Sequence, residues 1–258
     1  MQTLIVMYYD ECINIYIPTF ICLIYNKMES TYKEIFKFIL ENILKNKINT
    51  KNLTITCDFE TAMINSIKDT FIDARIVGCY FHFLQALIRK AKQLGYGKSK
   101  FKKELSLLPF KYKNNIEEIK NIINNIKNNH KDFNDFFNYF ESEWIPFFNN
   151  NMLKYKDIPK NIRTNNSIES LNGRLKKMSN YKANVTWLQY IDIILKLEKE
   201  YKEKIINLES LNTNNSINKN KTRKYENKIK SKNHYNIYFF KWNSFSCRFD
   251  SILFILYF

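Results

Sequence analysis

The stretch TITCDFETAM, residues 54–63, joins an apolar strand-like run to a helix-like run, and the carboxylate of Asp58 stands at the junction. The pattern continues as strand, helix, strand and helix over residues 52–57, 59–71, 74–79 and 80–97. Strands that alternate with helices over short connections are typical of a parallel sheet. We therefore expect Asp58 and Cys79 at the carboxyl edges of two neighbouring strands, where open α/β sheets build their sites.

The rest of the chain divides into regions of different pattern. Two β-rich runs, residues 3–9 and 15–25, predict an opening hairpin, and residues 32–47 predict an amphipathic helix. Helical spacing then dominates through residues 101–148, 163–178 and 184–211. We expect one α/β domain over residues 1–211 with a helical insertion at about 101–160, a polar basic linker over 212–233 and an apolar tail over 234–258. The tail either begins a truncated second domain or docks on the main body as a strand pair.

Charge and cysteine content restrict the classes of function. The 258 residues carry 41 Lys and Arg against 25 Asp and Glu, a formal charge of +16, which favours an anionic partner such as nucleic acid. AT-rich coding DNA would also produce the excess of Lys and Asn, so both explanations stay open. Five scattered cysteines favour a reducing, intracellular compartment. The apolar N-terminus matches neither a signal peptide nor a membrane span.

Two short motifs carry the candidate chemistry beside Asp58. Asp58 either caps the following helix or binds a metal ion. Cys79 and His82 form a C-x-x-H pair at the next strand-to-helix corner. Because the other histidines, His130 and His234, are isolated, the chain lacks the four ligands of a structural zinc site. We expect instead a polar corner beside Asp58, or a buried Cys79 with a hydrogen-bonded His82.

A third motif, RTNNSIESLNGRLKKM over residues 163–178, gathers polar and charged side chains at a helix start. One explanation is a well-capped helix exposed to solvent. The other is a functional site, because Glu169 lies near the apolar stripe of the helix and a carboxylate there is expected to have a partner. The residues that we expect to contact DNA here are Arg163, Asn165, Asn166 and Arg174.

Four segments in this order and separation resemble the transposase domain of Mutator-like elements, the MULE transposases. They are residues 18–36, 54–71, 74–95 and 163–178, and the resemblance covers about residues 1–200. It implies an α/β fold with an RNase H-like mixed sheet, N-terminally truncated, and a large helical insertion. It also implies a DDE triad that binds two divalent ions, Mg²⁺ or Mn²⁺, for DNA strand cleavage and transfer.

By motif matching, Asp58 is the second Asp of the triad and Glu169 is the Glu, both as catalytic residues and as metal ligands. Cys79 and His82 match the C-x-x-H pair of the family. The first Asp of the family precedes the hairpin, so the chain begins after it, and Asp10 in the hairpin turn is no substitute. We expect a transposase remnant that shows no strand cleavage with Mg²⁺ or Mn²⁺.

A second hypothesis is that the chain is a non-catalytic nucleic-acid-binding protein derived from a transposase. A third is that it is a decaying fragment of a mobile element without a selected function. We expect DNA as partner, no membrane, and a nuclear location with the cytoplasm as alternative; a homo-oligomer stays open. Around Cys247 the tail is similar to the nucleophile helix of papain-type cysteine peptidases, but no His follows it in the chain.

Overall fold

The computed structural model describes residues 2–10, 13–43, 53–96, 101–180, 185–215, 237–241 and 251–256. It contains two compact units, which we name by their place in the sequence. The central unit is Lys27–Asn166, and the terminal unit combines Met1–Asn26 with Ser167–Phe258. Helices and small sheets occur together, so the mixed α/β class is confirmed. The RNase H-like arrangement stays a prediction.

The terminal unit begins with the predicted hairpin. Strands β1 (Gln2–Asp10) and β2 (Ile15–Ile24) pair antiparallel. Val6 pairs with Phe20 whereas Met7 pairs with Pro18, so Thr19 forms a bulge. The bulge accommodates Pro18, which has no N–H to donate to the ladder. Asp10 ends β1 at the turn, as expected.

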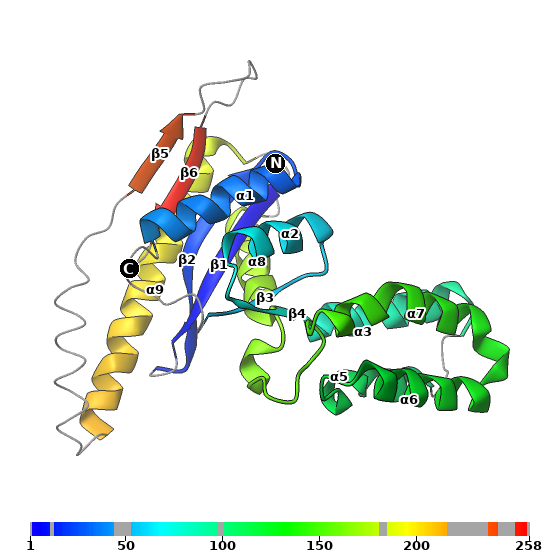
Figure 1. The fold of residues 1–258 in the computed structure, drawn as a ribbon. Coiled ribbons are helices and arrows are strands. Elements are labelled where there is room, and N and C mark those ends of the chain that lie inside the picture. Colours follow the sequence, from blue (N-terminus) through cyan, green and yellow to red (C-terminus); the bar gives the residue numbers. More distant parts are fainter. Residues whose placement is uncertain are drawn as a thin grey trace. The chain divides into compact units, whose positions relative to one another are not determined.

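The tail contributes two more strands to this sheet. Strands β5 (Ile237–Lys241) and β6 (Ser251–Leu256) pair antiparallel, and β6 also pairs with β2. The sheet order is therefore β1-β2-β6-β5 (Figure 1). This arrangement corresponds to the docked strand pair, one of the two alternatives for the tail. Cys247 and most of the expected linker lie outside the described residues.

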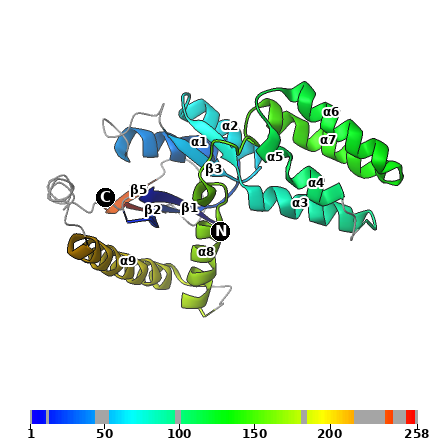
Figure 2. The same ribbon diagram turned by 90° about the horizontal axis from the view of Figure 1, so that it is seen from below.

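Two helices complete the terminal unit: α8 (Asn166–Met178) and α9 (Trp187–Asn215), which Figure 2 shows from below. They have apolar faces at helical spacing that cover the hairpin. The buried cluster that joins helices and hairpin consists of Ile5, Ile21, Leu171, Leu175, Ile193, Ile194 and Leu197.

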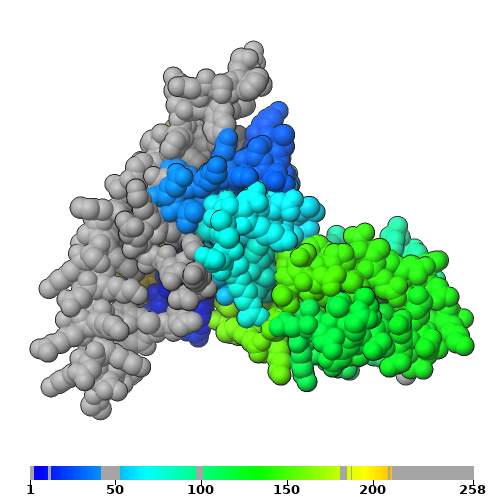
Figure 3. All heavy atoms as spheres, in the orientation of Figure 1, coloured from blue at the N-terminus to red at the C-terminus, as the bar shows by residue number. Residues whose placement is uncertain are grey.

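The central unit contains the predicted alternation of strand and helix. Strands β3 (Thr54–Cys57) and β4 (Arg75–Gly78) pair in parallel. The helices around them are α1 (Glu29–Phe38), continued by the π-helical η1 (Ile39–Ile43), then α2 (Thr61–Thr70) and α3 (Tyr80–Gln93). Helices α1 and α2 pack against each other, as the blue and cyan surfaces in Figure 3 show. The parallel pairing confirms that Asp58 and Cys79 follow the carboxyl ends of adjacent strands.

The expected helical insertion contains helices joined by short turns and no strand within its described residues. It comprises α4 (Phe101–Ser106), α5 (Leu108–Lys111), α6 (Ile116–Asn129), η3 (Lys131–Phe133), α7 (Asn134–Asn149) and η4 (Lys160–Ile162). Helices α6 and α7 run side by side (Figures 1 and 2). Six phenylalanines fill the core between α3 and these helices: Phe83, Phe101, Phe136, Phe137, Phe140 and Phe148. Among the described residues, no helix is both long and apolar enough to cross a membrane.

Candidate functional site

Asp58 lies between β3 and α2 but does not occupy the N-cap position of that helix. Glu60 is the N-cap residue, and its side chain makes no capping hydrogen bond. Instead, Glu60 accepts hydrogen bonds from Lys27 Nζ at 2.7 Å and from Tyr32 Oη at 2.9 Å. Glu60 therefore ties the start of α2 to the region of α1, and the carboxylate that faces the sheet edge is that of Asp58.

Asp58 is the centre of a polar cluster that we call the Asp58 corner, formed by Asp58, Cys79, His82 and Asn165. The Nδ2 atom of Asn165 donates to Asp58 Oδ1 at 2.7 Å. The Nδ1 atom of His82 lies 3.1 Å from the same oxygen. Cys79 Sγ donates to Asn165 Oδ1 at 3.0 Å, and the backbone N–H of Asn165 donates to Cys79 Sγ at 3.4 Å. Asn165 thus connects Asp58 to Cys79.

The parallel ladder explains why the C-x-x-H pair reaches Asp58. Cys79 N donates to Cys57 O at 2.8 Å, which extends the pairing one residue beyond the strands. Cys79 is also the N-cap residue of α3, so His82 falls in the first turn of that helix. Because the two strands end side by side, both residues of the pair lie beside Asp58.

Asn165 is distant in sequence and is brought to the corner by the segment that follows α7. Thr56 Oγ1 donates to Ile162 O at 2.6 Å, and Tyr80 N donates to Arg163 O at 2.9 Å. These two bonds fix the segment against β3 and against the start of α3. Asn165 follows directly, and its side chain is buried at 8% exposure.

Phe59, the residue after Asp58, packs against the helical insertion. Its ring makes edge contacts with Trp144 and with Phe147, with ring centroids 4.9 Å apart in each case. Aromatic pairs in this geometry stabilise by about 1 kcal/mol beyond the area that they bury. The helical insertion therefore helps to hold the backbone on which Asp58 stands.

The Asp58 corner is buried at Cys79 and exposed to solvent at Asp58 and His82. Cys79 is completely buried, whereas the side chains of His82 and Asp58 are 24% and 40% exposed. Burial raises the pKa of the Cys79 thiol, although backbone N–H groups of Asn165, His82 and Phe81 act in the opposite direction. A protonated, buried thiol is a poor nucleophile. The corner therefore suits binding at Asp58 better than covalent chemistry at Cys79.

The predicted DNA contacts Arg163 and Asn166 also belong to the central unit. Arg163 Nε donates to Ile158 O at 2.7 Å, and its guanidinium lies 5.1 Å from the centre of the Phe110 ring. These contacts hold the Arg163 side chain against the protein. Asn166 begins α8 and is exposed.

The remaining predicted residues, Glu169 and Arg174, lie on α8 in the terminal unit. Glu169 is in the first turn of the helix and is exposed. Arg174 forms an ion pair with Glu200 and lies 6.0 Å from the centre of the Tyr201 ring. The triad role of Glu169 and the DNA contact of Arg174 stay predictions.

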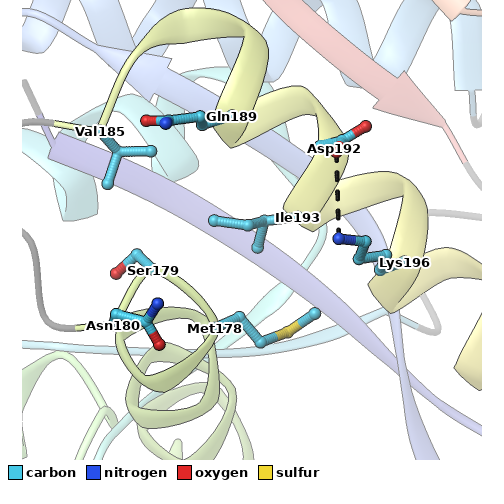
Figure 4. Close-up of a pocket in the computed structure, with 8 residues that line it drawn as sticks. All are labelled: Met178, Ser179, Asn180, Val185, Gln189, Asp192, Ile193 and Lys196. Carbon is cyan, nitrogen blue, oxygen red and sulfur yellow. Dashed lines mark ion pairs between the residues drawn. The ribbon is translucent and has the colours of Figure 1, made fainter.

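A pocket in the terminal unit contains none of the predicted site residues. It lies between the end of α8 and the start of α9, and Figure 4 shows the ion pair of Asp192 with Lys196, 3.9 Å long, on its rim. The lining residues are Met178, Ser179, Asn180, Val185, Gln189, Asp192, Ile193 and Lys196. This pocket was not predicted from the sequence.

Asn165, which we predicted to contact DNA, donates a hydrogen bond to Asp58, and its contact with DNA stays a prediction. The supporting contacts of Phe59 and Thr56 were not predicted from the sequence, because the partners of both residues lie far along the chain.

Comparison with known proteins gives one match. Residues 2–86 match the family model of the MULE transposase domain. The matched segment contains Asp58, Cys79 and His82 and ends within α3; Asn165 and Glu169 lie beyond it. The chain has no significant match among curated proteins or among solved structures. Over residues 2–86 this chain is therefore similar to the MULE transposase domain family.

Proposed function

We propose that this chain is a transposase-derived DNA-binding domain in which Asp58 holds a divalent cation against the DNA backbone. The observation that carries the proposal is the position of Asp58 at the carboxyl edge of β3, inside the matched segment, held by Asn165 and open to solvent. A transposase domain implies interaction with DNA. A nuclear location follows as part of the same proposal.

The residues of the corner fit a divalent cation, because a partly exposed carboxylate is a good ligand for Mg²⁺ or Mn²⁺. Such a cation, when bound, would stabilise charge on a phosphate oxygen and help to activate water or a 3′-hydroxyl. Asp58 would bind the cation, and Asn165 would fix the orientation of the carboxylate.

For the 258-residue polypeptide we propose DNA binding without strand cleavage. Within the described central unit, the corner contains one carboxylate, whereas in-line displacement by two ions uses several. The formal charge of +16 supports DNA binding, since it favours contact with phosphates. This charge also favours the second candidate, a nucleic-acid-binding protein in which Asp58 has no role in metal binding.

DNA binding is tested by fluorescence anisotropy of a labelled duplex at increasing salt. We expect the logarithm of the affinity to fall linearly with the logarithm of the salt concentration, by a slope of about 0.9 for each phosphate neutralised. Affinity that does not change with salt would contradict the proposal.

A nicking assay of the same complex with Mg²⁺ and with Mn²⁺ tests the second half of the proposal. We expect intact DNA. Strand cleavage that disappears in Asp58→Ala would show instead that the polypeptide keeps the family's chemistry.

A further inference from the structure

The Asp58 corner offers three different kinds of ligand atom. One carboxylate oxygen of Asp58, the sulfur of Cys79 and one ring nitrogen of His82 all lie within 4.8 Å of one another. Mg²⁺ takes oxygen ligands, whereas Zn²⁺ and Co²⁺ bind thiolate, imidazole and carboxylate together. We propose that the corner binds a single transition-metal ion of the Zn²⁺ class through Asp58, Cys79 and His82.

The geometry of Asp58 and His82 supports this inference. Their atoms Oδ1 and Nδ1 are 3.1 Å apart, but the ring nitrogen is not aligned for a hydrogen bond. His82 Nδ1 is a buried atom without a hydrogen-bond partner in the described part of the chain. Two ligands of one ion point at the ion and not at each other, and ligand atoms around tetrahedral zinc are about 3.5 Å apart. The observed separation is close to that spacing.

The hydrogen bonds around Cys79 would orient its sulfur as a metal ligand. Its sulfur accepts the backbone N–H of Asn165 at 3.4 Å, and its S–H proton is donated to Asn165 Oδ1 at 3.0 Å. When the sulfur–metal bond forms, the S–H bond breaks and the proton passes to solvent. The backbone N–H of Asn165 then remains as a donor to the thiolate, and Asn165 Nδ2 keeps Asp58 in place. Such supporting contacts are what orient metal ligands in proteins.

A tetrahedral ion that binds three protein ligands has one coordination position left for another ligand. The absence of four zinc ligands in the sequence excludes a closed structural site but not an open one, in which water or substrate takes the fourth position. The exposed side of the corner, where Asp58 is 40% accessible, provides that position. A phosphate oxygen of DNA is a ligand of suitable chemistry. The inference deepens the proposed function at the same residues, but metal binding can be measured without DNA.

The test is titration of the reduced, metal-free 258-residue protein with Co²⁺, followed by absorption spectroscopy. We expect a thiolate-to-cobalt charge-transfer band in the near ultraviolet and visible bands of a tetrahedral ion. Cys79→Ser should lose the charge-transfer band, and His82→Asn should weaken Co²⁺ binding by at least about tenfold. Added Zn²⁺ should displace the cobalt.

Two variants serve as matched controls: Cys57→Ser, at a buried cysteine outside the cluster, and His130→Asn, at a histidine paired with Glu104. Both should keep the spectrum, and circular dichroism checks the fold of every variant. The inference is wrong if the protein shows no charge-transfer band, if Cys79→Ser keeps it, or if only Mg²⁺ binds. Salt-dependent DNA binding by a protein that binds no Co²⁺ would contradict this inference and leave the proposed function standing.

Discussion

Cys57 and Asp58 are neighbours in the chain with opposite surroundings. Cys57 is 6% exposed, whereas the Asp58 side chain is 40% exposed. Burial raises the pKa of the Cys57 thiol to about 12, and the adjacent Asp58 carboxylate acts in the same direction. The end of β3 therefore buries one side chain and presents the next, as successive residues of a strand do.

The pKa of Cys57 predicts a loss of stability in alkaline solution. The thiol ionises near pH 8.5 in the unfolded chain, so above that pH the unfolded state binds fewer protons than the folded state. Because the thiol of the folded chain stays protonated up to about pH 12, the free energy of unfolding falls between these two values. In urea titrations at pH 8 and pH 10, we expect the free energy of unfolding of Cys57→Ala to fall by about 2 kcal/mol less than that of the native sequence. Equal losses would show that Cys57 does not contribute.

At the scale of elements, the site depends on a close approach between the end of β4 and the turn before α2. Gly78 is the last residue of β4, and a Cβ there would lie 2.3 Å from Phe59 Cε1. The Phe59 ring cannot move freely, because Trp144 and Phe147 pack against it. The absence of a side chain at Gly78 therefore permits the position of Phe59, and with it that of Asp58.

Gly78→Ala should destabilise the protein by about 1–3 kcal/mol, the usual effect of overpacking a tight core. Gly173→Ala is the control, since Gly173 lies exposed within α8 and a Cβ there meets nothing within 4 Å. This control should be neutral or stabilise by up to about 1 kcal/mol, because alanine favours helix. Urea unfolding followed by circular dichroism measures both. A neutral Gly78→Ala would mean that the Phe59 ring has room to shift.

The sequence predicted the elements better than their contacts. The hairpin, both parallel strands and the helical insertion were predicted from the spacing of apolar residues. This spacing is visible in a short stretch of sequence, because each strand or helix buries one of its faces. The same spacing also placed Asp58 and Cys79 at neighbouring strand ends. The role of Asn165 was not predictable from pattern, since its position depends on long-range contacts such as the hydrogen bond from Thr56 to Ile162, more than a hundred positions later. Local sequence equally could not show that Glu60 would bind Lys27 and Tyr32.

In the molecule as a whole, a strong positive charge occurs together with the exposed carboxylate of the Asp58 corner. The charge of +16 supplies attraction to nucleic acid that does not depend on sequence. We propose the Asp58 corner as the place where a cation joins the protein to a phosphate, since its carboxylate is exposed and Cys79 and His82 offer further ligand atoms beside it. Metal binding and DNA binding should therefore be coupled, and each should strengthen the other.

The coupling between metal binding and DNA binding is tested by the effect of Mn²⁺ on DNA affinity at constant ionic strength, measured in three proteins. The native sequence should bind a labelled duplex more tightly with Mn²⁺ than without it. Asp73→Asn, at an exposed carboxylate just before β4, should keep this gain. Asp58→Asn, which preserves size and an oxygen acceptor for Asn165, should lose it. An equal gain in Asp58→Asn would contradict the assignment of Asp58 as the metal ligand that faces DNA.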